Sequence, residues 1–241
     1  VHAYGGKGFA TVVNEKHALA AERAGVDALI VTGHEAAAHG GDVTSLVLIP
    51  AIRQVTTLPI IATGGFGTGG GLLAALALGA DAVAMGTRFA ASQESPVHAA
   101  TKKMITEKSV SDTIYTTNFD SMGCRIMKTP TAIAAAEKPL SLPRVLVKAL
   151  KAARETGQPM MALIRSVLKE GFLPALKLAY FGAATLQIRK AIMDGDHNDG
   201  VQLIGQVQGL VKDIPAVADI MQRVMQEAET ALSDVQSQVR A

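Results

Sequence analysis

The stretch from residue 59 to residue 89 constrains the fold of this chain more than any other. It reads PIIATGGFGTGGGLLAALALGADAVAMGTRF. Two short apolar runs, 59–63 and 81–85, are each stopped by glycine, and the alanine- and leucine-rich segment 72–78 between them has a high helix propensity. Apolar strands that alternate with helices are typical of a parallel sheet whose faces are covered. The stretch therefore predicts an α/β fold built from βα units.

Both predicted strands end in residues that suit a bound phosphate. The tripeptide Thr63-Gly64-Gly65 follows the first strand, and Gly86-Thr87-Arg88 follows the second. Bare backbone N–H groups, hydroxyls and a guanidinium are groups that hold phosphate oxygens. In a closed (β/α)8 barrel, the loops after the last two strands typically build the phosphate site. The alternative interpretation is that these glycines only tighten the two βα turns.

A dinucleotide site of the Rossmann type is disfavoured. The run Gly67-Thr68-Gly69-Gly70-Gly71 does not match the spacing G-x-G-x-x-G closely, and no acidic residue stands at the ribose-binding distance. Asp81 begins the second strand at its amino end, which is away from the ligand side of such a sheet.

The first 95 residues continue the same alternation. We expect the order β-α-β-α-β-α-β with right-handed crossovers, which is half of a barrel or of a doubly wound sheet. Asn14 is expected to cap the first helix, and Asp42 or Thr44 the second. The expected strands cover residues 9–13, 26–31, 59–63 and 81–85, and the expected helices cover 15–24, 46–55 and 72–78.

Residues 96–241 are predicted to be mostly helical, because the strand pattern disappears after Pro96. The segment 112–130 is mixed and irregular, and the acidic turn 194–200 lacks the glycine and glutamate of a calcium-binding loop. The chain thus divides into a βα domain, 1–95, and a helical C-terminal region, 96–241. The expected helices of that region are 97–107, 144–155, 160–170, 174–193, 201–211 and 215–239.

Composition and charge narrow the classes of partner. A formal net charge of +2 spread along the chain gives no electrostatic reason to expect nucleic-acid binding. The single cysteine, Cys124, excludes an internal disulfide and suits a reducing compartment. No segment approaches the roughly 18 apolar residues of a membrane span, and no signal-peptide pattern opens the sequence. We therefore expect a cytoplasmic protein without nucleic-acid or membrane partners.

The loop 32–42 carries the histidines that most merit a chemical role. It follows a predicted strand, so it opens on the same face as the two glycine turns, and it contains His34 and His39. A metal site is disfavoured because the histidines lack a fixed helical spacing and no cysteine supports them. A histidine could instead donate a hydrogen bond or remove a proton beside a cofactor, since imidazole titrates near neutrality. The remaining interpretation is a solvated loop whose histidines have no chemical role.

Several segments together resemble the nitronate monooxygenase family, formerly called 2-nitropropane dioxygenases. They are the loop GHEAAAHGG, the run 59–89 and the following SQESPVHAATKKMI. The later segment GVQLIGQVQGLVKDIPAVADIM resembles the G-Q-x-x-G-L element of the family's C-terminal helical part. The resemblance is collinear and covers nearly the whole chain. It implies an FMN-dependent flavoenzyme with a TIM-barrel fold.

The resemblance also implies a role for each matching residue. His39 matches the histidine of the family's E-A-G-G-H motif and is the expected catalytic residue. Arg88 would neutralise the phosphate or serve as a structural ion-pair partner, and Gln206 would approach the flavin ring. No metal ligand is expected. The other expected cofactor contacts are Thr32 and Gly33 along the flavin, Thr63, Gly64, Gly65, Gly86 and Thr87 at the phosphate, and Met85.

This chain departs from the family pattern in three respects. The two motif glycines are Ala37 and Ala38, whose methyl groups could crowd the flavin edge, and a lysine that the family often has near residue 11 is Thr11. The sequence also begins at about the fifth barrel strand. Four strands cannot close an eight-stranded barrel, so we expect the second half of a barrel: a fragment, one partner of a split barrel, or a homo-oligomer.

The leading functional hypothesis from the resemblance is FMN-dependent oxidation of alkyl nitronates, and of nitroalkanes if these are accepted, by molecular oxygen. The first alternative is an FMN-dependent enoyl-acyl-carrier-protein reductase, which shares these motifs and uses NAD(P)H. The second is an inactive half-barrel that acts as an interaction subunit. Bound flavin, and the choice between nitronate and enoyl thioester in an assay, would distinguish the three.

Overall fold

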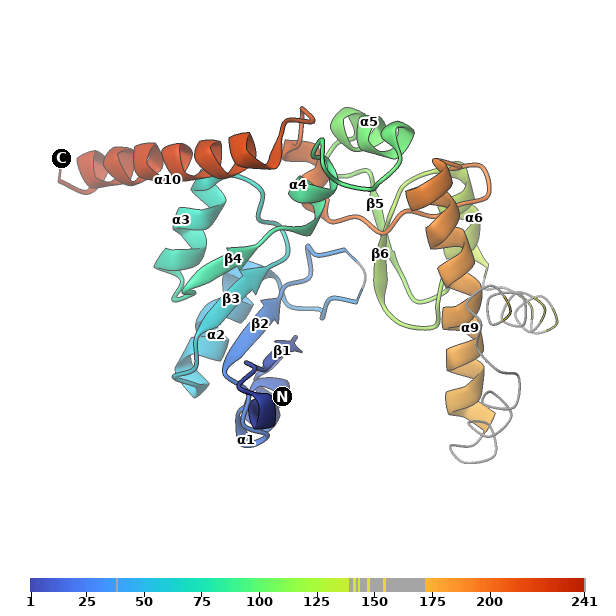
Figure 1. Cartoon of the computed structure of the whole chain (residues 1–241), viewed down its shortest axis with the longest axis horizontal. Helices are drawn as coiled ribbons and strands as arrows, with labels where there is room; N and C mark the ends of the chain where they lie inside the picture. The colour runs from blue at the N-terminus through green and yellow to red at the C-terminus, as the bar shows by residue number, and fades with distance from the viewer. Residues whose placement is uncertain are drawn as a thin grey trace. The chain divides into compact units, whose positions relative to one another are not determined.

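The computed structural model describes residues 1–37, 39–138 and 172–240, together with positions 141, 143, 147 and 154 (Figure 1). The chain forms two compact units. Unit 1 comprises Val1–Pro96, Lys102–Asp112 and Ile204–Ala241, and unit 2 comprises Val97–Thr101 and Thr113–Leu203. Because the last segment returns to unit 1, this division differs from the boundary expected between residues 95 and 96.

A parallel sheet forms the centre of unit 1 (Figure 1). Its strands lie in the order β1-β2-β3-β4, and each is parallel to the next. The alternation of strands and helices predicted for this region is therefore confirmed. Closure into an eight-stranded barrel, and assignment to its second half, stay predictions. The strands are β1 (Phe9–Val12), β2 (Ala28–Thr32), β3 (Ile60–Thr63) and β4 (Ala82–Ala84).

Three helices connect these strands and pack on one face of the sheet: α1 (Glu15–Arg23), α2 (Ser45–Val55) and α3 (Gly69–Ala77). Side chains alternate between the two faces along a strand, so every second strand residue enters this core. The buried cluster joins Val12, Leu29, Val31, Ile60 and Ala62 of the strands to Ala18, Leu48, Ile49, Ile52 and Ala75 of the helices.

The helix starts agree with local sequence in two cases and depart from it in one. Asn14 accepts a hydrogen bond from the His17 N–H at 2.8 Å, as predicted, and Thr68 likewise accepts from Gly71 at 3.2 Å. Thr44 stands at the N-cap of α2 without a side-chain cap bond. The expected N-cap position of Thr44 is thus confirmed, but the side-chain bond to the helix start comes from the carboxylate of Glu35.

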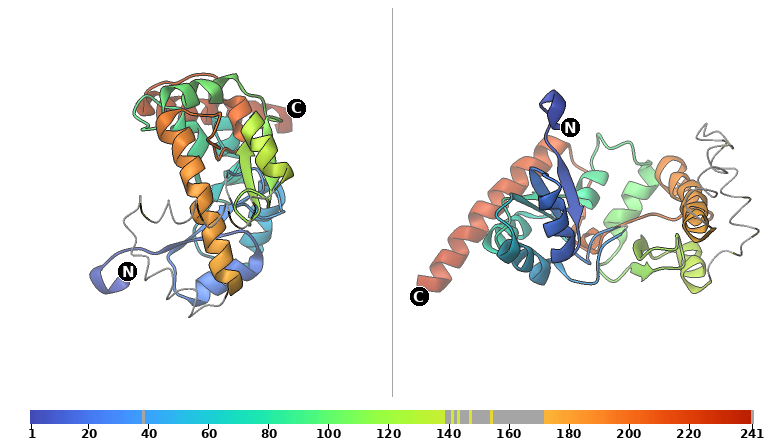
Figure 2. Two further views of the ribbon diagram at one scale, coloured as in Figure 1. Left: turned by 90° about the vertical axis from the view of Figure 1, so that its right-hand side faces the viewer. Right: turned by 90° about the horizontal axis from the view of Figure 1, so that it is seen from below.

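The remaining elements of unit 1 lie outside the sheet: one short 3-10 helix precedes the amino end of β1, and the others follow β4 in the chain. They are η1 (His2–Tyr4), α4 (Gly86–Ala90), most of α5 (Ala99–Glu107), the 3-10 helix η3 (Gln206–Leu210) and α10 (Val217–Arg240). Helix α10 crosses α3 and continues beyond it (Figures 1 and 2). The predicted helix over 201–211 is wrong outside η3, because Leu203 forms a β-bridge with Ile126 instead.

Unit 2 contains an antiparallel hairpin of β5 (Thr113–Thr116) and β6 (Cys124–Met127). Within the described part of this unit, the prediction of an irregular segment 112–130 is therefore corrected. Its helices are α6 (Pro130–Glu137) and α9 (Phe172–Arg189), which continues as the π-helix η2 (Lys190–Asp194). The helix expected at 174–193 is present, and those expected at 144–155 and 160–170 lie largely or wholly outside the described residues.

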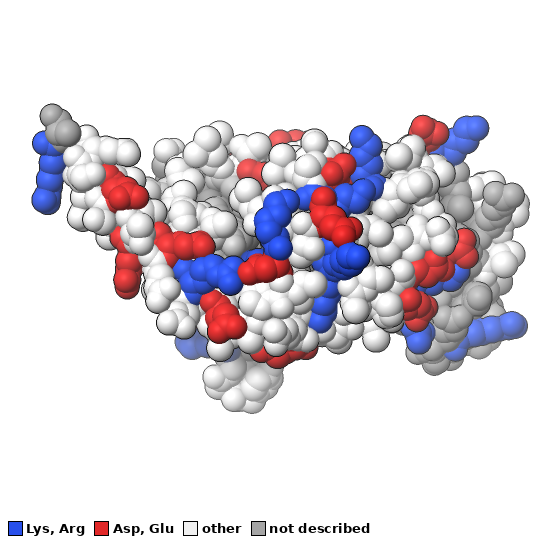
Figure 3. All heavy atoms as spheres, turned by 90° about the horizontal axis from the view of Figure 1, so that it is seen from above, with Lys and Arg blue, Asp and Glu red and all other residues white. Residues whose placement is uncertain are grey.

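Surface charge is mixed in sign. On the face shown in Figure 3, lysine and arginine side chains alternate with aspartate and glutamate side chains. Among the described helices, none combines the length and apolar character that crossing a membrane requires.

Candidate functional site

The turns after β2 and β3 meet at the carboxyl end of the sheet. Gly64 and Gly65 have φ angles of 96° and 86°, in the left-handed region that favours glycine. A Cβ added to Gly64 would lie 2.9 Å from the carbonyl oxygen of Gly33, so the two turns are in direct backbone contact. The Gly33 N–H also donates to the Thr63 carbonyl at 3.0 Å. Larger side chains at these positions would separate the turns.

Threonine is the last residue of β2 and of β3. Thr32 and Thr63 are register partners on β2 and β3. Thr63 donates from its hydroxyl to the Ala84 carbonyl at 3.0 Å, which leaves its oxygen lone pairs available. The Thr32 hydroxyl is buried and has no hydrogen-bond partner. A buried, unpartnered hydroxyl costs free energy, so a polar ligand group at this strand end would relieve that cost.

The segment Gly205–Gln206 joins this end of the sheet, although it is far away in the sequence. The Gly205 N–H donates to the Thr87 hydroxyl at 3.2 Å, and the Gln206 N–H donates to the Glu35 carbonyl at 2.9 Å. A Cβ on Gly86 would meet no heavy atom within 4 Å, so there is open space in front of that residue. Met85 precedes α4 at its N-cap and packs against the sheet core.

Three observations on the structure fit a bound cofactor that carries phosphate and other polar groups. Glycine backbones from two turns lie together, an open space faces Gly86, and a buried hydroxyl on Thr32 lacks a partner. The sequence-predicted residues thus gather at one end of the sheet in unit 1: Thr32, Gly33, Thr63, Gly64, Gly65, Met85, Gly86, Thr87 and Gln206.

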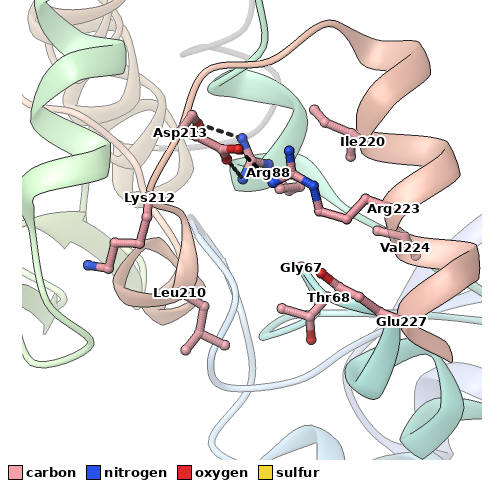
Figure 4. Close-up of a pocket in the computed structure, with 10 residues that line it drawn as sticks. All are labelled: Gly67, Thr68, Arg88, Leu210, Lys212, Asp213, Ile220, Arg223, Val224 and Glu227. Carbon is pink, nitrogen blue, oxygen red and sulfur yellow. Dashed lines mark hydrogen bonds and ion pairs between the residues drawn. The ribbon is translucent and has the colours of Figure 1, made fainter. Parts of the chain in front are cut away.

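Arg88 lies in the same turn but is engaged by protein groups. Its side chain is buried, and its guanidinium donates to the Asp213 carboxylate at 2.9 Å and the Asp213 carbonyl at 2.7 Å (Figure 4). It also donates to the Ala91 carbonyl at 3.0 Å. Of the two roles expected for Arg88, the structure contains the ion pair. The pocket beside it has a volume of about 210 Å³ and is also lined by Lys212 and Arg223.

The pKa of Asp213 reflects this contact. Burial alone would raise the pKa of the Asp213 carboxyl, but hydrogen bonds from Arg223 and Arg88 outweigh burial and hold that pKa below its ordinary value. The carboxylate therefore stays charged between the two guanidinium groups, and it connects the turn after β4 to the start of α10.

The loop after β2 presents its histidines differently. His34 directs Nδ1 to the Gly41 carbonyl at 2.8 Å, so this nitrogen carries the proton. His39 is exposed to solvent. Across the part of the chain that the structure describes, no group of three metal-ligating side chains is present. Burial raises the pKa of Cys124 to about 12, and this cysteine is therefore a packing residue rather than a nucleophile.

Two residues of this site were not singled out in the sequence. Glu35 lies within the histidine loop and binds Ser45 at the start of α2, and Asp213 neutralises Arg88 from 125 residues away. Glu35 carries no clear local signal, because Asp42 and Thr44 lie nearer to the start of the same helix. Asp213 carries none, because its role depends on contacts that only the fold creates.

Comparison with known proteins relates the whole arrangement to one family. Residues 7–227 match the family model described as nitronate monooxygenase. A Mycobacterium tuberculosis protein, (3aS,4S,5R,7aS)-5-hydroxy-7a-methyl-1-oxo-octahydro-1H-indene-4-carboxyl-CoA dehydrogenase, is 32% identical over 225 residues, 90% of this chain and 63% of that protein. A probable nitronate monooxygenase from Staphylococcus aureus is 38% identical over 122 residues, 46% of this chain and 34% of that protein.

Solved structures share the fold. FabK from Thermotoga maritima has a TM-score of 0.73 and 31% identity, covering 97% of this chain and 64% of that chain. A nitroalkane oxidase from Streptomyces ansochromogenes has a TM-score of 0.73, covering 97% of this chain and 60% of that chain; at 22% identity it shows the fold alone. The chain spans about 63% of the length of the Mycobacterium tuberculosis protein and 62% of that of its Rhodococcus jostii counterpart. By its match over 7–227, this chain belongs to the nitronate monooxygenase family of oxidoreductases.

Proposed function

We propose that this chain provides the cofactor-binding turns of an FMN-dependent oxidoreductase that oxidises alkyl nitronates with molecular oxygen. The observation that carries the proposal is the meeting of two glycine turns beside the buried, unpartnered hydroxyl of Thr32. FMN, when bound, accepts electrons from the substrate and passes them to oxygen, and the protein supplies position and electrostatic field.

The expected division of labour follows the positions of the residues. The backbone N–H groups around Gly64, Gly65 and Gly86, with the hydroxyls of Thr63 and Thr87, would hold the phosphate. Thr32 and Gly33 would lie along the flavin, with Met85 and Gln206 close to them. Arg88 would support this site indirectly, because its ion pair with Asp213 fixes the turn after β4.

His39 is the proposed catalytic residue. Its exposed imidazole lies in the loop that follows β2, so it can reach a small substrate without displacing packed side chains. It would hydrogen-bond the anionic nitro group of a nitronate, and it would remove a proton from carbon if a neutral nitroalkane is accepted. The proposed reactants are thus a small nitronate and oxygen.

The first test is to add excess FMN to the purified chain, desalt it, and record the visible absorption spectrum and nitronate-dependent oxygen consumption. The proposal expects retained flavin and measurable turnover. Loss of flavin on desalting would contradict the assignment of these turns as the FMN site. Retained flavin without oxygen consumption would contradict the nitronate reaction alone.

A variant then tests the role of His39. The change His39→Ala should leave FMN retention unchanged and lower nitronate turnover about tenfold, the scale of one lost hydrogen bond to a charged group. His17→Ala, on an exposed helix position, is the matched control and should leave turnover unchanged. Equal turnover of wild type and His39→Ala would make His39 a spectator.

A second candidate is flavin-dependent redox chemistry on an acyl thioester. It is favoured by coverage, since the carboxyl-CoA dehydrogenase relatives match about 90% of the chain and the probable nitronate monooxygenases match 46%. The likeness to FabK supports the enoyl reductase form of this chemistry. Flavin bleaching by an acyl-CoA without oxygen, or NAD(P)H oxidation that depends on an enoyl thioester, would favour this candidate over nitronate oxidation.

A further inference from the structure

We propose that Glu35 is a positioning residue that fixes the flavin-facing turns of this site. The inference rests on the proposed FMN site and adds a residue to it. Glu35 is the hub at which the loop after β2, the turn after β3, the start of α2 and the segment Gly205–Gln206 are joined. Its loss should loosen the cofactor turns without removing any group that touches the cofactor.

The carboxylate of Glu35 holds the start of α2. Its two oxygens accept from the Ser45 backbone N–H at 3.1 and 2.9 Å, ten residues further along the chain. Thr44, at the N-cap position, makes no side-chain bond to the helix. A carboxylate at a helix N-terminus satisfies a free N–H and interacts favourably with the helix dipole. Glu35 therefore ties its own loop to a rigid element of the fold.

Ser45 passes this contact on to the turn after β3. Its hydroxyl lies 3.1 Å from the Glu35 carboxylate and donates to the Gly64 carbonyl at 2.7 Å. The aliphatic part of Glu35 packs on the next residue, because a Cβ added to Gly65 would lie 3.3 Å from the Glu35 Cβ. Gly64 is thus bonded to Glu35 through Ser45, and Gly65 packs directly against Glu35.

Two more contacts complete the hub. The Glu35 carbonyl accepts from the Gln206 N–H at 2.9 Å, and a Cβ on Gly205 would lie 3.1 Å from that same oxygen. A Cβ on Gly33 would lie 2.7 Å from the Glu35 carboxylate and would collide with the Ser45 hydroxyl. Apart from the start of α2, every segment that Glu35 joins therefore carries a residue assigned to the cofactor: Gly33, Gly64, Gly65 or Gln206.

The variant that tests the hub is Glu35→Gln, which keeps the size of the side chain and removes its charge and one acceptor. The matched control is Asn14→Ala, which removes the side-chain cap of α1 in the same way but outside the site. Both variants should lower the urea concentration at the midpoint of apoprotein unfolding by a similar amount, because each weakens one helix cap. If Glu35 contributed only to the stability of the fold, the two variants would change the affinity for FMN equally.

The binding measurement is quenching of FMN fluorescence by the apoprotein. The proposal expects the dissociation constant of FMN to rise about tenfold in Glu35→Gln, the scale of one lost charged hydrogen bond, and to stay at the wild-type value in Asn14→Ala. An unchanged constant in Glu35→Gln, or an equal rise in both variants, would overturn the proposal.

Backbone hydrogen exchange separates this inference from the proposed function. Without FMN, Glu35→Gln should speed exchange in peptides that cover residues 33–36, 63–65 and 205–208, whereas Asn14→Ala should speed it only around α1. Unchanged exchange in those three peptides would refute the hub. If the wild-type protein binds no FMN and Glu35→Gln still exchanges faster than wild type in those three peptides, the result supports the hub and contradicts the FMN proposal.

Discussion

At the scale of single residues, the polar side chains that shape this site act over long sequence distances. Glu35 binds the backbone ten residues away, and Asp213 accepts from Arg88 at 2.9 Å and from Arg223 at 2.6 Å. In both cases a carboxylate connects an element of the sheet region to a helix. Although these carboxylates are partly exposed, each one joins two segments of the chain near the site.

Ionisation of Asp213 makes the free energy of unfolding depend on pH in the acid range. Its pKa is lowered in the folded protein, so its stabilising contribution is fully present above the ordinary aspartate pKa of about 3.9 and is lost as the pH falls through the lowered value. Asp213→Asn should therefore flatten the fall of the free energy of unfolding below that pH. The effect should be on the order of 1 kcal/mol, since the carboxylate is partly exposed and screened.

Urea unfolding at a series of pH values measures this effect. The same series in 1 M salt is the control, because salt screens the partly exposed pair and should shrink the difference between wild type and Asp213→Asn. Parallel pH curves for the two proteins at low salt would show that the arginine contacts do not stabilise the fold.

Contacts between residues close in the sequence could be predicted, whereas contacts between distant residues could not. Asn14 could be assigned as a cap because its partner, His17, is three residues away. The gathering of Thr63 and Gly86 at one end of the sheet followed from the parallel order of the strands. The ion pair of Arg88 with Asp213 could only be left as one of two alternatives, because its partner lies 125 residues along the chain.

At the scale of secondary-structure elements, the crossing of α10 over α3 depends on one glycine. A Cβ on Gly69 would collide with the backbone of Val224 and Ala228 in α10, and the Gly69 N–H donates to the Glu227 carboxylate at 2.8 Å. The neighbouring Gly70 faces open space, with no heavy atom within 4 Å of an added Cβ. The two adjacent glycines thus have opposite roles in one helix.

This contrast gives a matched pair of substitutions. Gly69→Ala should lower the free energy of unfolding by about 2 kcal/mol, because the helices must move apart. Gly70→Ala should raise it by about 0.5–1 kcal/mol, because alanine is the better helix former and meets no obstacle. Thermal unfolding of the two variants beside wild type measures both. Equal effects of the two substitutions would mean that the α3–α10 contact is not tight.

Elements were predictable where apolar runs and glycine stops agreed, as in β2 and β3. The hairpin of β5 and β6 was missed because its strands have four residues each and a connection of seven residues without a two-residue turn signal. The helix expected at 201–211 fails because its backbone bonds elsewhere: Gln206 donates to Glu35, and Leu203 pairs with Ile126. Tertiary hydrogen bonds outweighed propensity there.

At the scale of the whole molecule, Cys124 offers a probe of unfolding. It is the single cysteine and is fully buried, and burial raises its pKa to about 12. Labelling by a thiol reagent at pH 8 should be at least about a hundredfold slower in the native protein than in urea. In the native protein the reagent cannot reach the buried sulfur, and only a small fraction of the thiol is ionised. The time course of labelled mass measures the rate. Native labelling at the unfolded rate would contradict the burial of unit 2 around this residue.

Unit 1 is assembled from three separate stretches of chain, and Gln208 holds two of them together. Its fully buried amide donates to the carbonyls of Ser109, at 3.2 Å, and Asp112, at 2.9 Å. The chain leaves unit 1 just after Asp112 and re-enters it at Ile204. The intervening ninety or so residues, Thr113–Leu203, are therefore inserted between two stretches of unit 1 that Gln208 joins. Because those hydrogen bonds involve residues of unit 1 alone, we expect a change in the length of that insert to leave the sheet and its glycine turns in place.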